Sequence, residues 1–159
     1  MYMKRFISFA IAFVCLFAVV SAVYAADVQV GTWKINLAKS KYNPANLAPK
    51  STTVKNDAVD GGVKITVDTV DYTGKALHYE YTVKYDGKDN AVKGDPNRDM
   101  TSMKKVDDNT FDQTNKKGGK VTTTSKIVYA RDGKSRTITT TGTNPQGVKV
   151  NNVVVWDKQ

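Results

Sequence analysis

The amino-acid sequence predicts an all-β protein, an antiparallel up-and-down meander of eight to ten strands that closes into a barrel. Apolar and polar side chains alternate along runs of six to ten residues, and turns rich in Gly, Asp and Asn separate these runs. Because the turns are short, successive strands become neighbours in the sheet. Closure is the usual way to remove the exposed edges of a sheet with this many strands.

The clearest strand spans residues 76–86. Its side chains alternate strictly, with one face carrying Leu77, Tyr79, Tyr81, Val83 and Tyr85 and the other carrying His78, Glu80, Thr82 and Lys84. A period of two residues is incompatible with a helix. The same pattern predicts eight further strands, at 29–36, 51–58, 63–71, 98–105, 110–116, 120–130, 135–143 and 147–158.

Turn residues agree with these strands. Between the alternating runs lie Asp60-Gly61-Gly62, Asp86-Gly87, Gly118-Gly119 and Asp132-Gly133. Type I′ turns need positive φ at both central residues, which Asp tolerates and Gly adopts freely.

Two connections are longer. Residues 38–50 contain two prolines, with Tyr42 and Leu47 as their only large apolar side chains. This segment is either a surface loop or a lid over the barrel mouth, where long loops of such barrels often lie. Residues 89–97 are also expected to form a loop.

The N-terminus has the features of a cleavable export signal. Lys4 and Arg5 precede an apolar run at 6–20, and small residues before Ala26 suit cleavage after Ala25. A retained membrane anchor is the alternative, but a run of about 15 residues is shorter than the roughly 20 that a spanning helix needs. The sequence therefore predicts a signal peptide at 1–25 and one domain at 26–159, periplasmic or secreted, with no stable membrane insertion after cleavage.

Processing changes the composition of the chain. The single cysteine, Cys15, leaves with the signal, so no disulfide supports the remaining domain of about 134 residues. The formal net charge falls from +9 to +7 because Lys4 and Arg5 are removed. The cations are dispersed, which favours a solvated basic surface, with weak attraction to anionic envelope surfaces as the alternative. No basic helix or RNA-recognition motif is present, so nucleic acid is not expected as a partner.

The inward faces of the predicted strands mix apolar and polar side chains. Trp33, Ile35 and Leu37 share one face, and Val154 and Trp156 share another. Polar groups on inward faces each cost about 1–3 kcal/mol when unpaired. A cavity with water or a partly polar ligand would satisfy them, whereas a barrel filled by its own side chains is the alternative. The candidate ligand-binding residues are Tyr79, Tyr81, Gln113, Tyr129, Arg136, Thr140 and Asn152.

The motif Gly31-Thr32-Trp33-Lys34 resembles the opening strand of lipocalins and intracellular fatty-acid-binding proteins, together the calycins. The closing Val155-Trp156-Asp157-Lys158 is similar to the last strand of the fatty-acid binders. The resemblance implies a lipocalin-like barrel in which Trp33 plugs the closed end and a small hydrophobic or amphipathic ligand lies inside. Two departures matter. Val154 stands where fatty-acid binders place an Arg for the ligand carboxylate, and Lys158 is the nearest counterpart of the lipocalin cation that packs over the opening Trp.

A longer match covers most of the domain. Ser40-Lys41-Tyr42, residues 84–89 and residues 150–159 are similar to the corresponding segments of an uncharacterised family of exported bacterial proteins. This resemblance implies export but no function.

Catalysis finds little support in the sequence. The only histidine, His78, shares its strand face with Glu80 but has no nucleophile near it, and a surface cross-strand contact is the simpler interpretation. Asp57, Asp60, Asp107 and Asp108 are turn residues without a converging set of metal ligands. We therefore expect no enzyme, no cofactor and no metal.

Two functions remain. The first is an exported carrier that holds an apolar or mixed-polarity ligand in the barrel. The second is a non-catalytic structural or interaction module of the envelope with a filled core. Its expected contact surface is an outer face with exposed threonines, at Thr122, Thr124, Thr139 and Thr141.

Overall fold

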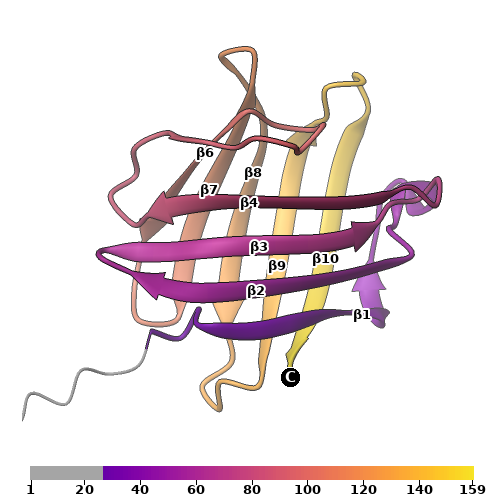
Figure 1. The fold of residues 1–159 in the computed structure, drawn as a ribbon. Helices are drawn as coiled ribbons and strands as arrows, with labels where there is room; N and C mark the ends of the chain where they lie inside the picture. Colours follow the sequence, from indigo (N-terminus) through magenta and orange to yellow (C-terminus); the bar gives the residue numbers. More distant parts are fainter. Residues whose placement is uncertain (1–26) are drawn as a thin grey trace, which may run out of the picture.

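A computed structural model describes residues 27–159, and the predicted signal at 1–25 lies outside the described residues. Figure 1 shows the strands and one short 3₁₀ helix, η1. None of the helices in this part of the chain has the length and apolar character needed to cross a membrane. The elements are β1 (Gly31–Lys41), η1 (Ala45–Leu47), β2 (Ser51–Val59), β3 (Gly62–Val70), β4 (Ala76–Lys84), β5 (Asn90–Ala91), β6 (Met100–Lys105), β7 (Thr110–Lys117), β8 (Lys120–Tyr129), β9 (Ser135–Thr143) and β10 (Lys149–Lys158).

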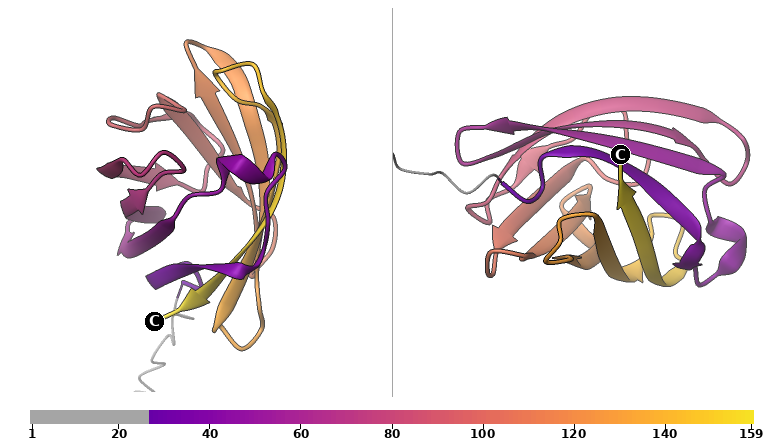
Figure 2. Two further views of the ribbon diagram at one scale, coloured as in Figure 1. Left: turned by 90° about the vertical axis from the view of Figure 1, so that its right-hand side faces the viewer. Right: turned by 90° about the horizontal axis from the view of Figure 1, so that it is seen from below.

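The strands form one antiparallel sheet in the order β4-β3-β2-β1-β10-β9-β8-β7-β6-β5. Strands that are consecutive in sequence pair with each other, except β4 and β5, which are the two edge strands of the sheet. The pairing of β1 with β10 joins the two halves. The sheet curves so that β1–β4 lie across the later strands (Figures 1 and 2). Where its two ends meet, Asp86 and Lys104 form an isolated bridge, which leaves the barrel nearly closed. The predicted up-and-down barrel is therefore confirmed.

All nine predicted strands are present, but the prediction for the first was wrong in detail. β1 continues to Lys41, through part of the segment predicted as a loop. Its register with β10 shifts between Asn36 and Lys41, which face Val155 and Val153 respectively. The Ser40 hydroxyl stabilises this bulge because it donates to the Asn36 carbonyl (2.6 Å) and accepts from the Val155 amide (3.0 Å).

The bulge also overturns one inward-facing assignment. Trp33 and Ile35 are buried, whereas Leu37 is 40% exposed because it lies beyond the last residue in regular register. Strict alternation holds only while the ladder is continuous. The short strand β5 was not predicted, because two paired residues leave no periodic pattern.

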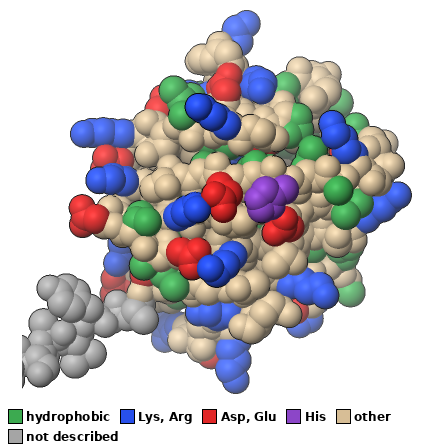
Figure 3. Space-filling view, viewed as in Figure 1, with side chains coloured by type: hydrophobic (Ala, Val, Ile, Leu, Met, Phe, Trp, Pro, Cys, Tyr) green, Lys and Arg blue, Asp and Glu red, His purple; other side chains and the backbone are tan. Residues whose placement is uncertain are grey.

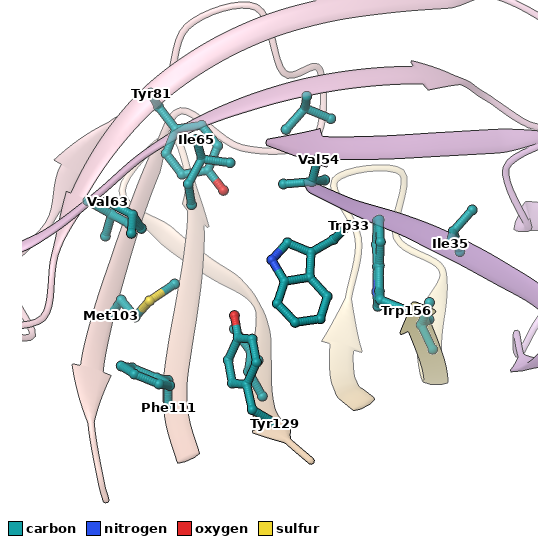
Figure 4. Close-up of a cluster of buried hydrophobic side chains, with 14 of the residues drawn as sticks. Trp33, Ile35, Val54, Val63, Ile65, Tyr81, Met103, Phe111, Tyr129 and Trp156 are labelled. Atoms are coloured by element: carbon teal, nitrogen blue, oxygen red, sulfur yellow. The ribbon is translucent and has the colours of Figure 1, made fainter. Parts of the chain in front are cut away.

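A packed aromatic core occupies one end of the barrel (Figure 4). Trp33 is fully buried there, with its ring 5.3 Å from that of Tyr129 at an interplanar angle of 70°. Tyr129 in turn packs edge-on against Phe111, with ring centroids 5.9 Å apart. Edge-to-face pairs of this kind add to the free energy of simple burial. We call this region the closed end.

The segment before β1 crosses the closed end instead of forming the strand start predicted at residue 29. Gln29 is 1% exposed, and its carbonyl accepts hydrogen bonds from Trp33 Nε1 (2.9 Å) and Asn56 Nδ2 (3.0 Å). Its side-chain amide donates to Met103 Sδ (3.2 Å) and accepts from the Tyr129 hydroxyl (3.3 Å). Residues 27–30 thus form a strap that joins strands from both halves of the barrel.

Gly31 is required where this strap enters β1. Its φ is +130°, and a Cβ atom at this position would lie 2.5 Å from Lys158 Cε. The absence of a side chain lets Lys158 lie over the Trp33 ring, with Nζ 5.2 Å from the ring centroid. Gly31, the first residue of the Gly-Thr-Trp-Lys motif, thereby leaves space for the side chain of Lys158 at the end of β10.

Candidate ligand-binding site

A cavity of about 670 Å³ lies inside the barrel. Four connecting segments line its outer end, which we call the mouth: the region around η1, the β3–β4 turn, residues 95–98 and the β9–β10 turn. Tyr42, Leu47 and Pro49 come from the first of these, so the long connection predicted as a loop or a lid lies at the mouth. Apolar side chains line much of the interior, among them Ile35, Val54, Ile65, Val67, Ile127 and Ile138.

Six of the seven sequence-predicted ligand-binding residues line this cavity, namely Tyr79, Tyr81, Gln113, Arg136, Thr140 and Asn152. Tyr129 does not line it, and its predicted ligand contact is not supported by its position. Its ring is packed within the closed end, because Tyr129 is the last residue of β8 and its inward face meets Trp33. Its hydroxyl instead accepts a hydrogen bond from Arg136 Nη1 (3.0 Å).

Polar residues along the cavity wall mostly bond to one another. The Gln113 side chain donates to Thr101 Oγ1 (3.2 Å), and the hydroxyls of Ser125 and Thr140 are 2.8 Å apart. These pairs satisfy polar groups that the sequence suggested would need water or ligand. Asn152 Oδ1 accepts from the Asn43 amide (3.0 Å), which attaches the segment after β1 to β10.

Arg136 lies between the cavity and the closed end. It is 5% exposed, and its Cζ atom is 4.9 Å from the ring centroid of Trp33 and 5.0 Å from that of Trp156. Trp156 lines the cavity and Trp33 does not, so the guanidinium marks the inner limit of the hollow. Ring faces attract a cation in this arrangement. Arg136 joins Lys158 as a second cation over the opening Trp, which the sequence did not indicate.

A second arginine links β4 to β7. Arg98 Nη2 donates to the Tyr81 hydroxyl on β4 (3.1 Å), and Nη1 donates to Asn115 Oδ1 on β7 (2.9 Å). Its Nε lies 2.9 Å from Asp95 Oδ2, and both charged side chains are largely buried. We call this set of contacts the Arg98 latch. Sequence reasoning missed it because Asp95 lies in the segment predicted as a loop and Arg98 begins the strand predicted at 98–105, so alternation gave no sign that their side chains meet.

Sequence reasoning also missed several other lining residues. Asn56 shares the inward side of β2 with Thr52 and Val54, so the alternation of that strand could have identified it. Trp156 was expected to face inward but was not chosen as a ligand contact. Gln29 was placed at the start of the strand predicted at 29–36, whereas it lies in the strap and lines the cavity.

Burial affects the phenols at the mouth. Removal from water raises the pKa of Tyr42 to about 12. Burial, together with the negative charge of Asp95, also raises the pKa of Tyr79 well above its usual value. Both hydroxyls therefore stay protonated at neutral pH and present hydrogen-bonding groups without charge.

The outer surface carries the remaining candidate groups. Figure 3 shows His78 between acidic side chains on the outer face of β3 and β4. His78 Nδ1 is 2.6 Å from Asp68 Oδ1, whereas Glu80 pairs with Lys64. The contact is cross-strand, as expected, although its partner is Asp68. Within residues 27–159, no three His, Cys, Asp or Glu side chains are grouped as a metal site would require.

Comparison with known proteins adds no relative. No protein-family model matches the chain, and no curated protein matches its sequence. The arguments for function therefore rest on the cavity and its residues.

Proposed function

We propose that this protein is an exported carrier that holds a small amphipathic molecule inside its barrel. The observation that supports this proposal best is the cavity of about 670 Å³, which falls within the roughly 300–1,000 Å³ typical of small-molecule sites. Its lining combines apolar side chains with a few positioned polar groups, as such sites do. A barrel filled by its own side chains would leave no comparable space.

Kinship with the calycins is part of the same proposal. Trp33 near the start of β1 is fully buried, and the cations of Lys158 and Arg136 lie over its ring. These contacts agree with the resemblance in the Gly-Thr-Trp-Lys motif. Export rests on the predicted signal at 1–25. N-terminal sequencing of the protein from the periplasmic fraction should begin at Ala26, and recovery of the uncleaved chain in the membrane would contradict export.

A blocking substitution tests the binding proposal. Thr140 lines the cavity on β9, whereas its neighbour Thr139 is exposed on the outer face. Thr140→Trp should fill part of the cavity, and Thr139→Trp should leave it open. We expect the uncharged dye N-phenyl-1-naphthylamine to fluoresce on binding to the unaltered protein. Its affinity should fall at least about tenfold in Thr140→Trp, which corresponds to about 1.4 kcal/mol.

Thr139→Trp serves as the matched control and should bind the dye as the unaltered protein does. Equal dye binding by the two variants would mean that the dye occupies the surface. Failure of the unaltered protein to bind this dye or any co-purified molecule, as judged by native mass spectrometry, would count against a carrier.

One observation favours the envelope module as a second candidate. The outer faces of β8, β9 and β10 carry several threonines and valines, and Val121, Val128 and Val153 are exposed. Thr139 faces Lys126 on one side and Val153 on the other. Thr139→Glu with Val153→Glu should abolish capture of envelope polymer at low salt. Lack of any capture by the unaltered protein would remove this candidate.

A further inference from the structure

Four buried residues form the inner end of the cavity, which we call the polar floor. Gln29 comes from the strap, Asn56 from β2, Arg136 from β9 and Trp156 from β10, and all four line the cavity. Arg136 and Trp156 face each other directly across the β9–β10 ladder. Figure 4 shows Trp156 beside Trp33, the ring that lies beneath the floor. The floor therefore combines a cation with hydrogen-bonding groups from four separate parts of the chain.

The charge of Arg136 has no anionic partner in the part of the chain that the structure describes. None of the ion pairs among the described residues includes Arg136. The contrast with Arg98 is informative, because that buried guanidinium has Asp95 beside it. Aromatic rings stabilise the Arg136 cation, but they do not neutralise it. A buried charge without a counter-ion is costly, so an anion at this position would be favoured.

Hydrogen bonding at the floor is also incomplete. Arg136 Nε and Trp156 Nε1 are buried donors without an acceptor among residues 27–159, and Asn56 Oδ1 is a buried acceptor without a donor there. Neither an indole nor a guanidinium can accept a hydrogen bond, so both donors require an acceptor from elsewhere. Asn56 Oδ1 requires the opposite, a hydroxyl or N–H.

Hydrogen bonds made by other polar atoms of the floor help to fix its geometry. Arg136 Nη1 is bound to Tyr129, and Asn56 Nδ2 is bound to the Gln29 carbonyl. Gln29 uses both ends of its amide, on Met103 and Tyr129. Rotation of Arg136 or Asn56 toward other partners would break these bonds. These bonds hold Arg136 and Asn56 in position. The three unpaired atoms have almost no accessible surface, so the head of a ligand must displace neighbouring side chains to reach them.

We propose that the polar floor binds the carboxylate head of an amphipathic ligand, and that this head carries a neighbouring hydroxyl or amide N–H. Hydroxy acids and N-acylamino acids share this chemistry. The carboxylate accepts from Arg136 and Trp156, and the neighbouring donor bonds to Asn56 Oδ1. The apolar part of the ligand contacts cavity residues such as Ile65, Val67 and Ile127. This inference rests on the proposed function, because it specifies the ligand of the same cavity.

Three chain-matched competitors test the proposal on the unaltered protein. Decanol, decanoate and 3-hydroxydecanoate displace N-phenyl-1-naphthylamine with affinities that report the head group alone. Charge-assisted hydrogen bonds are worth about 1.5–3 kcal/mol each, so decanoate should bind about 10- to 100-fold more tightly than decanol at neutral pH. The added hydroxyl should increase affinity a further ~2- to 10-fold, as expected for a neutral hydrogen bond.

Substitutions at the polar floor test whether Arg136 and Trp156 cause the preference for decanoate. Arg136→Met should reduce the affinity for decanoate to that for decanol. Arg131→Met removes the same charge from an exposed turn and should change neither affinity, which controls for the net positive charge. Because Arg136 also packs on Trp33, its loss can unfold the closed end. Trp156→Phe keeps a six-membered aromatic ring and removes the indole donor, and it should weaken decanoate binding ~2- to 10-fold without affecting decanol binding.

The outcomes separate this inference from the proposed function. Equal binding of decanol and decanoate, with the dye still bound in the cavity, would overturn the inference and leave the carrier proposal standing. Arg136 would then be a structural cation held by its ring contacts. Preference for decanoate without any gain from the hydroxyl would overturn the assignment of Asn56. If the dye and all three competitors fail to bind, both proposals fail together.

Discussion

The two ends of the barrel are built on different principles although the same strands run through both. At the closed end, the ring of Tyr129 packs between those of Trp33 and Phe111. The strap accepts hydrogen bonds from the Trp33 indole and the Tyr129 hydroxyl. Toward the mouth the same sheet surrounds a cavity, and polar contacts such as the Arg98 latch join its margins. The comparison teaches that one half of the domain supplies the stability that allows the other half to stay hollow.

The difference follows from the side chains available to each half. Large aromatic rings bury much apolar surface per residue, and they fill the tapering end of a barrel. The mouth half has phenols at its rim, such as Tyr79, but much of its wall consists of smaller branched and polar residues such as Val67, Thr140 and Val150, which leave space between facing strands. A domain without a disulfide in the described residues must obtain its stability from the packed half.

The largest expected effect tests the closed end directly. Trp33→Ala should lower the free energy of unfolding by about 3–5 kcal/mol, because it removes a fully buried ring and leaves a void. Val150→Ala, at the cavity, should cost about 1 kcal/mol or less because the site is already open on one side. Urea denaturation measures both. Equal costs would mean that the two ends contribute alike to stability.

The next effect tests the polar closure near the mouth. Arg98→Met should lower the free energy of unfolding by about 3 kcal/mol, because it leaves Asp95 buried without its partner. The double substitution Arg98→Met with Asp95→Leu should recover part of that loss, since it removes both charges. Urea denaturation of all four chains gives the coupling energy. A coupling near zero would show that the ion pair between Arg98 and Asp95 adds no stability to the latch.

A smaller effect tests the strap. Gln29→Ala should cost about 2 kcal/mol, because it removes the side-chain contacts with Met103 and Tyr129 within the closed end. Gln146→Ala, at an exposed turn of the mouth, should change stability by less than about 0.5 kcal/mol. Thermal unfolding of the two variants provides the comparison. Similar melting temperatures would indicate that the strap adds little to the closed end.

The smallest expected effect concerns the contact between His78 and Asp68 on the outer face of β3 and β4. The hydrogen bond and charge of Asp68 raise the pKa of His78 above its usual value of 6.5. The contact therefore contributes its stability below pH 6.5 and loses it as the pH rises through the raised pKa. The contribution is small because water screens both exposed side chains. An NMR titration should show the pKa of His78 falling toward 6.5 in Asp68→Asn, and an unchanged pKa would contradict the pair.

The sequence predicted the strands well because each one lies between solvent and interior, so its two faces must differ in polarity. β4 illustrates this, with Tyr81 and Val83 buried and Thr82 and Lys84 exposed. The prediction was wrong where pairing was irregular. Leu37 points away from the interior because the ladder shifts after Asn36, and a shift in register leaves no mark on the alternation.

For the site, alternation identified inward-facing residues but could not assign their height along the barrel. Tyr129 and Thr140 both face inward, yet Tyr129 is packed in the closed end and Thr140 lines the cavity. Height depends on the stagger between neighbouring strands, which no single strand encodes. Arg98 and part of the strap were placed at the starts of predicted strands, at residues 98 and 29, but both lie outside the strands of the structure. Their contacts depend on the tertiary structure, so alternation did not reveal them.

By itself, the sequence determined the class of fold, the order of its strands and which face of most strands is apolar, because these depend on local turn chemistry and on the exclusion of apolar side chains from water. Only the tertiary structure decided which end is packed, where the cavity lies and which polar groups within it lack partners. Those properties depend on contacts between residues far apart in the chain, such as Gln29 with Tyr129 and Trp33 with Arg136.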